Sequence, residues 1–210
     1  MELKPDSNAT NQRLDEIAAG GASFDELFAR YREMLRQAVE LRLDNGLRAR
    51  VDASDVVQET QLEAFRRLPD YLERRPMPFR LWLRKMASER LIMLRRQHVN
   101  AARRSVRREY HLPAESSVQL GRQLIGGGPT PSQEVRAEEL ADQVRQAVAG
   151  LPEQDRELLL MRNYEGLSYN EIGQILDIDP ATARKRNGRA LVKLHSLLRN
   201  HGVTESGWQT

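Results

Sequence analysis

Two helix start signals close together near the C-terminus constrain the fold of this chain more than any other feature. Ser168 and Glu171 form a capping box, in which each side chain accepts a hydrogen bond from a backbone amide that the helix start leaves unpaired. Asp179 before Pro180 marks a second start, because Asp caps the first turn and Pro lacks the amide hydrogen that this position leaves free. A short break separates the two helices. The sequence therefore predicts a helix-turn-helix within residues 166–189.

The second helix of this motif carries basic side chains near its start. In a helix-turn-helix, the N-terminal part of the second helix enters the major groove of DNA. A solvated basic surface is the alternative, but the helix dipole disfavours cations at this end of a helix. We therefore expect the motif to bind DNA. The predicted contact residues are Thr182, Arg184, Lys185, Arg186 and Arg189.

Apolar residues at helical spacing predict helices through much of the remaining chain. One long helix is expected from Phe24 to about Leu43, opened by a capping box at Ser23 and Glu26. The other expected helices run from near Asp52 to Pro69, from Phe79 to Leu94, from Leu140 to Leu151, and from Pro152 onward. The expected core positions of the second helix are Val56, Val57, Ala64, Phe65 and Leu68. No strand-like alternation of useful length is present, so the predicted fold class is all-α.

Proline and glycine residues cluster between residues 112 and 133. The run Gly126–Gly128 and its neighbouring prolines resist packing and suit a flexible connector. We therefore expect two small helical domains joined by a flexible linker, the second containing the helix-turn-helix. The expected divisions are an N-terminal extension at 1–22, a helical domain at 23–111, the linker at 112–133, the helix-turn-helix domain at 134–200 and a tail at 201–210.

Composition excludes several classes of protein. The chain has no cysteine, which rules out disulfides and thiolate metal sites. No apolar run reaches the roughly 18 residues that span a bilayer, so no membrane insertion and a cytoplasmic location are expected. The formal net charge is only +3, but residues 80–112 carry 10 basic and 2 acidic side chains, against 10 basic and 14 acidic in residues 1–70. This imbalance predicts a second contact with nucleic acid.

Two groups of side chains in the N-terminal half form candidate surfaces. Asp55, Gln58 and Glu59 share one face of their helix, for which a merely solvated acidic face is the alternative. Trp82 lies beside cations, a pairing that binds unpaired bases and phosphates, although a core position for this ring is equally compatible with the sequence. The predicted DNA-binding residues of its helix are Arg80, Trp82, Arg84, Lys85, Arg90, Arg95 and Arg96. The cations that extend this basic segment are Arg103, Arg104, Arg107 and Arg108.

Three segments together resemble the sigma factors of bacterial RNA polymerase. The Asp-x-x-Gln-Glu pattern within residues 52–60 resembles their polymerase-binding helix, and residues 79–87 resemble the promoter-melting helix. Residues 151–194 resemble the C-terminal sigma domain that reads the minus-thirty-five element. Two such domains joined by a short linker are similar to the extracytoplasmic-function (ECF) group. The order of the three segments makes this resemblance specific.

The resemblance implies an initiation factor that directs promoter-specific transcription and has no catalytic activity of its own. Asp55, Gln58 and Glu59 would dock on the basic coiled coil of the largest polymerase subunit. Residues 70–78 would recognise a flipped base of the minus-ten element. Core RNA polymerase and promoter DNA are the expected partners, with an anti-sigma factor as a further candidate. Departures from the family pattern, which keep promoter sequence from being carried over, lie at Gln61, Glu89, Met93, Asp177, Ala183 and Asn187.

Two other classes of protein are alternatives to a sigma factor. A stand-alone DNA-binding regulator would use only the helix-turn-helix, and it would leave the face with Asp55 unexplained. A nucleic-acid enzyme would need a metal or phosphate site, and Gly126–Gly128 lacks the Lys and Ser or Thr of a phosphate-binding loop. We therefore expect no catalytic residue, no metal and no cofactor. Metal-ligand spacing is missing from the four histidines, which are His98, His111, His195 and His201.

Overall fold

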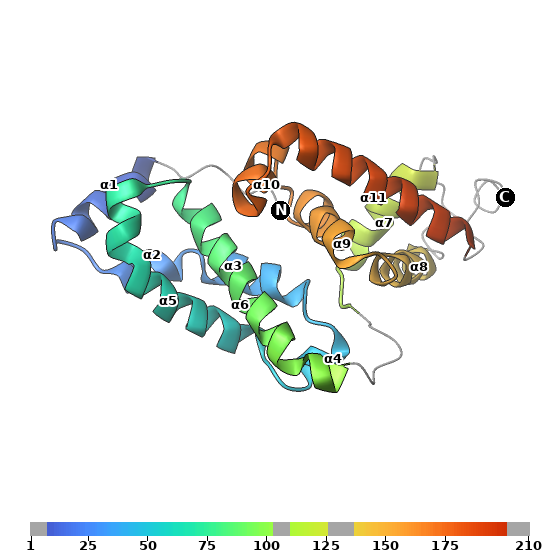
Figure 1. Ribbon diagram of the computed structural model, residues 1–210, viewed down its shortest axis with the longest axis horizontal. Helices are drawn as coiled ribbons and strands as arrows, with labels where there is room; N and C mark the ends of the chain where they lie inside the picture. The colour runs from blue at the N-terminus through green and yellow to red at the C-terminus, as the bar shows by residue number, and fades with distance from the viewer. Residues whose placement is uncertain (1–7, 103–109, 126–136, 201–210) are drawn as a thin grey trace. The chain divides into compact units, whose positions relative to one another are not determined.

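The computed structural model describes residues 8–102, 110–125 and 137–200, and its regular elements there are all helices (Figure 1). The chain divides into two compact units. The N-terminal unit holds helices α1 to α6, and the C-terminal unit holds most of the residues of helices α7 to α11. The predicted all-α fold with two helical domains is therefore confirmed. No helix in these ranges is long and apolar enough to cross a membrane.

The N-terminal unit packs its helices around an aliphatic and aromatic core. Its helices are α1 (Asn8–Ala18), α2 (Phe24–Ala29), α3 (Arg32–Glu40), α4 (Asn45–Arg48), α5 (Ala53–Arg74) and α6 (Phe79–Ala102). The ring of Phe79, at the start of α6, lies 5.6 Å from the ring of Tyr31 and 5.4 Å from that of Tyr71. Side chains far apart in sequence therefore meet at one aromatic cluster. The fully buried core includes Leu14, Phe28, Leu35, Val56, Phe79 and Leu83.

The long helix expected over residues 24–43 is wrong, because the chain turns between α2 and α3. Tyr31 occupies this turn, and its hydroxyl lies 2.8 Å from the hydroxyl of Thr10 in α1. Ser23 makes no side-chain capping hydrogen bond, so the predicted capping box is also absent. Glu26 instead accepts a hydrogen bond from Arg13 at 3.1 Å. Packing against α1 therefore decides the local conformation here, and helical periodicity alone does not.

Helix α5 also differs from its expected extent, because it passes through Pro69 and ends at Arg74. Proline inside a helix removes one hydrogen bond and costs about 3 kcal/mol. Leu68 and Tyr71 are both buried in the core, one on each side of Pro69 in sequence. Their burial holds the last turns of α5 in place against that cost. The predicted loop over residues 70–78 is accordingly shorter, because residues 70–74 are helical.

Part of the expected N-terminal extension belongs to the core of the N-terminal unit. Helix α1 buries Leu14 completely and Thr10 almost completely. Asp15 on the same helix forms an ion pair with Arg75, just after α5. Residues 8–18 are therefore a structural part of this unit.

The C-terminal unit is a smaller bundle that ends in the helix-turn-helix. Its elements are α7 (Ala114–Ile125), α8 (Ala137–Ala149), α9 (Glu153–Leu159), a π-helical turn (Leu160–Tyr164), α10 (Tyr169–Leu176) and α11 (Pro180–Asn200). The predicted motif over residues 166–189 thus corresponds to α10 and the first half of α11. The fully buried core includes Val144, Val148, Leu159, Ile172, Ala190 and Leu194.

Helix α7 lies within the segment expected to be a flexible linker, so that expectation is wrong for residues 114–125. Leu120 is buried, and Ser117 lies 3.1 Å from the hydroxyl of Tyr164. A Cβ at Gly121 would lie 3.0 Å from side-chain atoms of Leu140 and Val144 in α8. This glycine therefore permits close packing of α7 against α8, although glycines and prolines in this segment had indicated a linker. Residues 126–133 of the expected linker lie outside the described residues.

Candidate nucleic-acid interface

Both helices of the helix-turn-helix begin at the predicted caps. At α10, the Ser168 amide donates to Glu171 at 2.7 Å, and the Glu171 amide donates to the Ser168 hydroxyl at 3.3 Å. At α11, the Thr182 amide donates to Asp179 at 2.8 Å, and the Thr182 hydroxyl donates to the second carboxylate oxygen. These hydrogen bonds lower the pKa of Asp179 below its ordinary value. The local sequence thus fixes both helix starts.

The turn between the two helices depends on a close approach of the backbone. Asp177 adopts the left-handed conformation with φ 55°, which ends α10. The Ile178 amide then donates to the Gly173 carbonyl at 3.0 Å. A Cβ at Gly173 would lie only 2.6 Å from the Ile178 carbonyl oxygen. Glycine is therefore required at Gly173, and Asp is tolerated at Asp177 because it enters the left-handed region more readily than most side chains.

Helix α11 separates a buried side from a basic exposed side. Ala183, Asn187 and Ala190 face the core of the C-terminal unit. The structure exposes four of the five predicted contact residues, Arg184, Lys185, Arg186 and Arg189. The fifth, Thr182, is half-buried, and its hydroxyl is engaged in the Asp179 cap. Gly188 lies within the basic side, and a Cβ at this position would meet no atom of the described residues within 4 Å.

Tyr169, which was not among the predicted site residues, is a neighbour of this basic side. Its ring lies beneath the guanidinium of Arg184, with 6.0 Å between the Cζ atom and the ring centroid. Its hydroxyl accepts a hydrogen bond from Asn187 at 3.2 Å. Tyr169 lies between the two capping-box residues Ser168 and Glu171, so the sequence places it at the start of α10. The capping box does not indicate the contact between its ring and Arg184.

The face of α5 predicted to dock on a partner begins with exposed polar residues. Asp55 and Gln58 are exposed and make no hydrogen bond or ion pair with the described part of the chain. Glu59 is half-buried and forms an ion pair with Arg90 of α6. Arg90 was predicted to bind DNA, so this pair ties together residues that had been assigned to two different surfaces.

Apolar side chains continue the same side of α5. Leu62 and Phe65 are 59% and 61% exposed, although Phe65 had been expected in the core. The Phe65 ring lies 5.7 Å from the ring of Phe24, so it covers the edge of the core from outside. Exposed apolar side chains next to exposed polar ones are typical of a binding surface.

Helix α6 hides part of the predicted basic surface. Arg80 and Arg84 are buried, so neither presents its charge to solvent in this structure. Both share a helical phase with Ala87 and Leu91, which are also buried. Their phase along the helix is the sequence signal that indicates this burial. Arg80 and Arg84, both predicted to bind DNA, are therefore not accessible to it in this structure.

The other predicted residues of α6 differ in their exposure. Trp82 is half-buried, with its ring 4.4 Å from that of Tyr71. Arg95 donates to the backbone carbonyl of Arg42 at 2.6 Å. Lys85 is half-exposed and Arg96 is exposed. Outside the described residues lie Arg103, Arg104, Arg107 and Arg108.

The connection from α5 to α6 has a defined conformation. Arg75 adopts the left-handed conformation with φ 39°, and its amide donates to the Tyr71 carbonyl at 2.7 Å. The Tyr71 hydroxyl donates to the Met77 carbonyl at 2.9 Å. The side chain of Arg75 also pairs with Asp15. These contacts tie the segment predicted to recognise a flipped base to α1 and α5.

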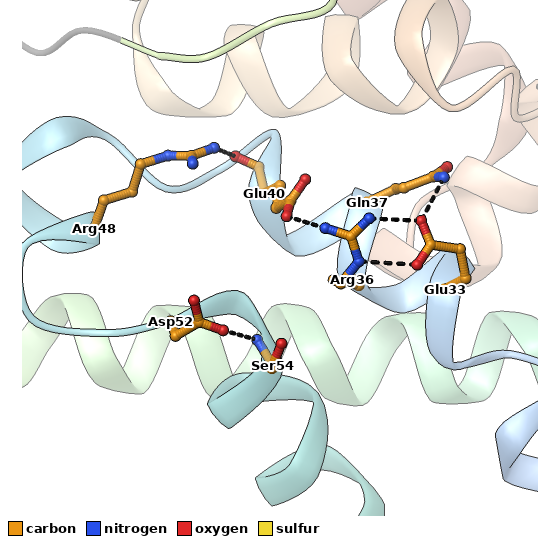
Figure 2. Close-up of polar contacts among 7 residues, drawn as sticks. All are labelled: Glu33, Arg36, Gln37, Glu40, Arg48, Asp52 and Ser54. Atoms are coloured by element: carbon orange, nitrogen blue, oxygen red, sulfur yellow. Dashed lines mark hydrogen bonds and ion pairs between the residues drawn. The ribbon is translucent and has the colours of Figure 1, made fainter.

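Polar contacts hold α3 and cap the start of α5 in two separate groups (Figure 2). Arg36 on α3 pairs with Glu33 at 2.7 Å and also with Glu40. Hydrogen bonds from Arg36 and Gln37 lower the pKa of Glu33 to about 2. Asp52 caps α5 by accepting the Ser54 amide at 2.6 Å, as the expected start near Asp52 requires. The ion pairs therefore lie within α3, and only the Asp52 cap belongs to the helix that carries the docking face.

Comparison with protein families identifies two matching regions. The family described as Sigma-70 region 2 matches residues 27–108, and the family described as Sigma-70, region 4 matches residues 141–194. The ECF RNA polymerase sigma-E factor of Escherichia coli (strain K12) is 30% identical over 190 residues, which cover 86% of this chain and 90% of that protein. The ECF RNA polymerase sigma factor SigE of Mycolicibacterium smegmatis is 28% identical over 151 residues, and the match spans about half of its length, 53%.

Solved structures share the fold. The structure of CnrH in complex with the cytosolic domain of CnrY has a TM-score of 0.56 at 22% identity, covering 91% of this chain and 98% of that one. The sigma factor RpoE in complex with the anti-sigma factor NepR from Bartonella quintana has a TM-score of 0.55 at 19% identity, covering 84% and 96%. At these identities the likeness concerns the arrangement of helices.

Proposed function

The chain belongs to the ECF RNA polymerase sigma factors, and we propose that its two units divide promoter recognition between them. It binds core RNA polymerase and directs promoter-specific transcription initiation, whereas the phosphodiester chemistry belongs to the polymerase. The observation that carries the division is that the region 2 match falls in the N-terminal unit and the region 4 match falls mostly in the C-terminal unit.

In the N-terminal unit, α5 docks on core polymerase. Asp55 and Gln58 supply exposed groups with no competing partner in the described residues, and they face the basic coiled coil of the largest polymerase subunit. Leu62 and Phe65 add apolar area on the same side of the helix. Glu59 contributes less to docking, because its ion pair with Arg90 would have to be given up.

In the same unit, α6 and the segment before it contact the minus-ten element. Trp82, Lys85 and Arg96 keep some or all of their side-chain surface accessible, so they stack on unpaired bases or contact phosphates. Arg80 and Arg84 support the helix from inside. The segment over residues 75–78 recognises a flipped base, and the hydrogen bond from Tyr71 to Met77 holds it in position.

In the C-terminal unit, α11 reads the minus-thirty-five element. Arg184, Lys185 and Arg189 are exposed on the half of α11 that enters the major groove in this motif. Arginine and lysine side chains in that groove pair with guanine edges or with phosphates. The accessible surface at Gly188 lets the DNA approach the α11 backbone.

The cellular setting follows from these partners. Core polymerase and promoter DNA place the chain in the cytoplasm. A solved structure with the same fold holds a sigma factor in complex with an anti-sigma factor. We extend this kind of regulation to the present chain, with an anti-sigma factor that covers one or both of its proposed binding surfaces.

The experiment that tests the proposed function is reconstitution with core polymerase. The purified chain is mixed with core enzyme, the complex is isolated, and transcripts initiated on genomic DNA are sequenced from their 5′ ends. We expect a stable complex and start sites that share two upstream sequence elements. A chain that fails to bind core enzyme, or start sites identical to those of core enzyme alone, would exclude the proposal.

A further inference from the structure

Tyr169, the first residue of α10, joins the two helices of the helix-turn-helix through its ring. The guanidinium carbons of Arg162 and Arg184 lie 5.0 Å and 6.0 Å from its ring centroid. A guanidinium within about 6 Å of a ring centroid is attracted by the negative face of the ring. Arg162 is also held by a hydrogen bond to the Leu167 carbonyl at 2.9 Å. The ring therefore contacts one fixed cation and one cation that belongs to the DNA-reading helix.

The hydroxyl of Tyr169 makes a second link to the same helix. It accepts a hydrogen bond from the Asn187 amide nitrogen at 3.2 Å. Asn187 is only 2% exposed, and its Oδ1 atom has no hydrogen-bond partner among the described residues. A buried amide that is only half satisfied is unfavourable for stability, so an apolar side chain would suit this position better. The pair is better explained by the fixed geometry that it imposes on α10 and α11.

Apart from the Tyr169 ring, Arg184 makes no directional contact with the described residues. Its side chain is exposed and makes no hydrogen bond or ion pair with the part of the chain that the structure describes. An unrestrained arginine on a helix surface samples many rotamers and loses that freedom on binding. The contact with the Tyr169 ring restricts these rotamers before DNA arrives.

We propose that Tyr169 is a positioning residue. It orients the guanidinium of Arg184 for contact with the upstream promoter element. This inference rests on the proposed function of α11. The ring restricts Arg184, and the hydroxyl fixes the ring through Asn187. Tyr169 thereby contributes to DNA affinity through Arg184, and it need not contact DNA itself.

A double-mutant cycle on holoenzyme tests this positioning role. Holoenzymes assembled from core polymerase and each full-length variant are titrated with a duplex that carries the promoter found by transcript sequencing. Y169L, which removes the ring, should weaken binding about two- to five-fold, the size of one exposed cation–π contact. In the R184A background, Y169L should have no further effect. In the matched R189A background it should keep its full effect, because Arg189 makes no ring contact among the described residues.

A second variant separates positioning from stability. Y169F keeps the ring but leaves the Asn187 amide without its partner, so it should lower the thermal unfolding midpoint and retain most of the DNA affinity. Should Y169L not fold, Y169M replaces it, since methionine is apolar, unbranched and of similar length. Equal weakening by the ring-free variant in wild-type, R184A and R189A backgrounds would mean that Tyr169 is merely structural and would overturn the inference. So would unchanged affinity of Y169L. If R184A and R189A themselves bind the promoter like wild type, the proposed role of α11 fails first.

Discussion

At the scale of single residues, Gly188 is a helix-interior glycine that no contact within the described chain explains. A Cβ at this position would meet no atom within 4 Å, and the backbone there is helical. Glycine inside a helix costs roughly 0.5 to 1 kcal/mol relative to alanine. Gly188 leaves the backbone accessible on the basic side of α11, as close approach of DNA requires. The loss of stability is therefore explained by binding.

The first prediction concerns this glycine. Gly188→Ala should raise the free energy of unfolding by about 0.5 to 1 kcal/mol, because the helix is favoured and no clash is created. It should also weaken promoter binding, because a methyl group is added to the face that meets DNA. Chemical unfolding and promoter titration measure the two effects. Gly121→Ala is the comparison variant and should gain less stability than Gly188→Ala, because its Cβ would lie 3.0 Å from side-chain atoms of Leu140 and Val144, which would have to shift. Stronger promoter binding by Gly188→Ala would contradict the assigned face.

The second prediction concerns the cap of α11 and its dependence on pH. Hydrogen bonds from Thr182 hold the pKa of Asp179 below its ordinary value of 3.8, so the ionised carboxylate favours the folded state. This contribution is present above pH 3.8 and is lost as the pH falls through the lowered pKa. Asp179→Asn keeps a capping oxygen but removes the titration.

The measurement compares thermal unfolding midpoints of wild type and Asp179→Asn across acid pH. The difference between the two midpoints should be constant near neutral pH. Below pH 3.8 the midpoint of wild type should fall relative to that of Asp179→Asn. Other carboxylates, such as Glu33 with its pKa of about 2, titrate in both proteins and cancel in the comparison. If the difference stays the same down to pH 2, the negative charge of the Asp179 carboxylate does not contribute to the stability of the folded state.

At the scale of elements, local chemistry could be predicted from sequence, and tertiary packing could not. The caps at Ser168 and Asp179 involve neighbours within three residues, so the starts of α10 and α11 were predictable. The turn at Tyr31 depends on Thr10, and the continuation of α5 past Pro69 depends on burial of Tyr71. Those contacts bring together side chains from separate helices, which no local pattern contains.

The candidate site shows the same division. The exposure of Arg184, Lys185 and Arg189 follows from the phase of α11, and the sequence predicted it. The burial of Arg80 and Arg84 also follows from helical phase, but charge composition outweighed phase in the prediction. Charge counted over a window says how basic a segment is, whereas phase decides which cations reach solvent.

The third prediction concerns α1, which lies before the matched region 2 segment. Leu14→Ala should lower the free energy of unfolding by about 2 to 5 kcal/mol, because a fully buried leucine leaves a cavity when truncated. Asn11→Ala, at an exposed position of the same helix, is the control and should change stability little. Chemical unfolding of the full chain measures both. Equal stability of the two variants would mean that α1 is not part of the folding unit.

At the scale of the whole molecule, polymerase docking and upstream-element recognition belong to different units in the proposed function. Asp55 and Gln58 lie on α5 of the N-terminal unit, and Arg184 and Lys185 lie on α11 of the C-terminal unit. Because each group is exposed, substitutions there should change binding and leave each fold intact. The two activities should therefore be lost separately.

The most direct measurement is the affinity for core polymerase, determined together with promoter-specific transcription for the same variants. Asp55→Arg combined with Gln58→Arg should weaken core binding and all transcription, because the two introduced positive charges would be repelled by the basic coiled coil. Asn11→Arg, which adds a positive charge at an exposed position of α1 in the same unit, should behave as wild type. Arg184→Ala combined with Lys185→Ala should keep wild-type core affinity and lose transcription from promoters that need the upstream element. Wild-type core affinity in the Asp55 and Gln58 variant, or loss of core affinity in the Arg184 and Lys185 variant, would contradict the account.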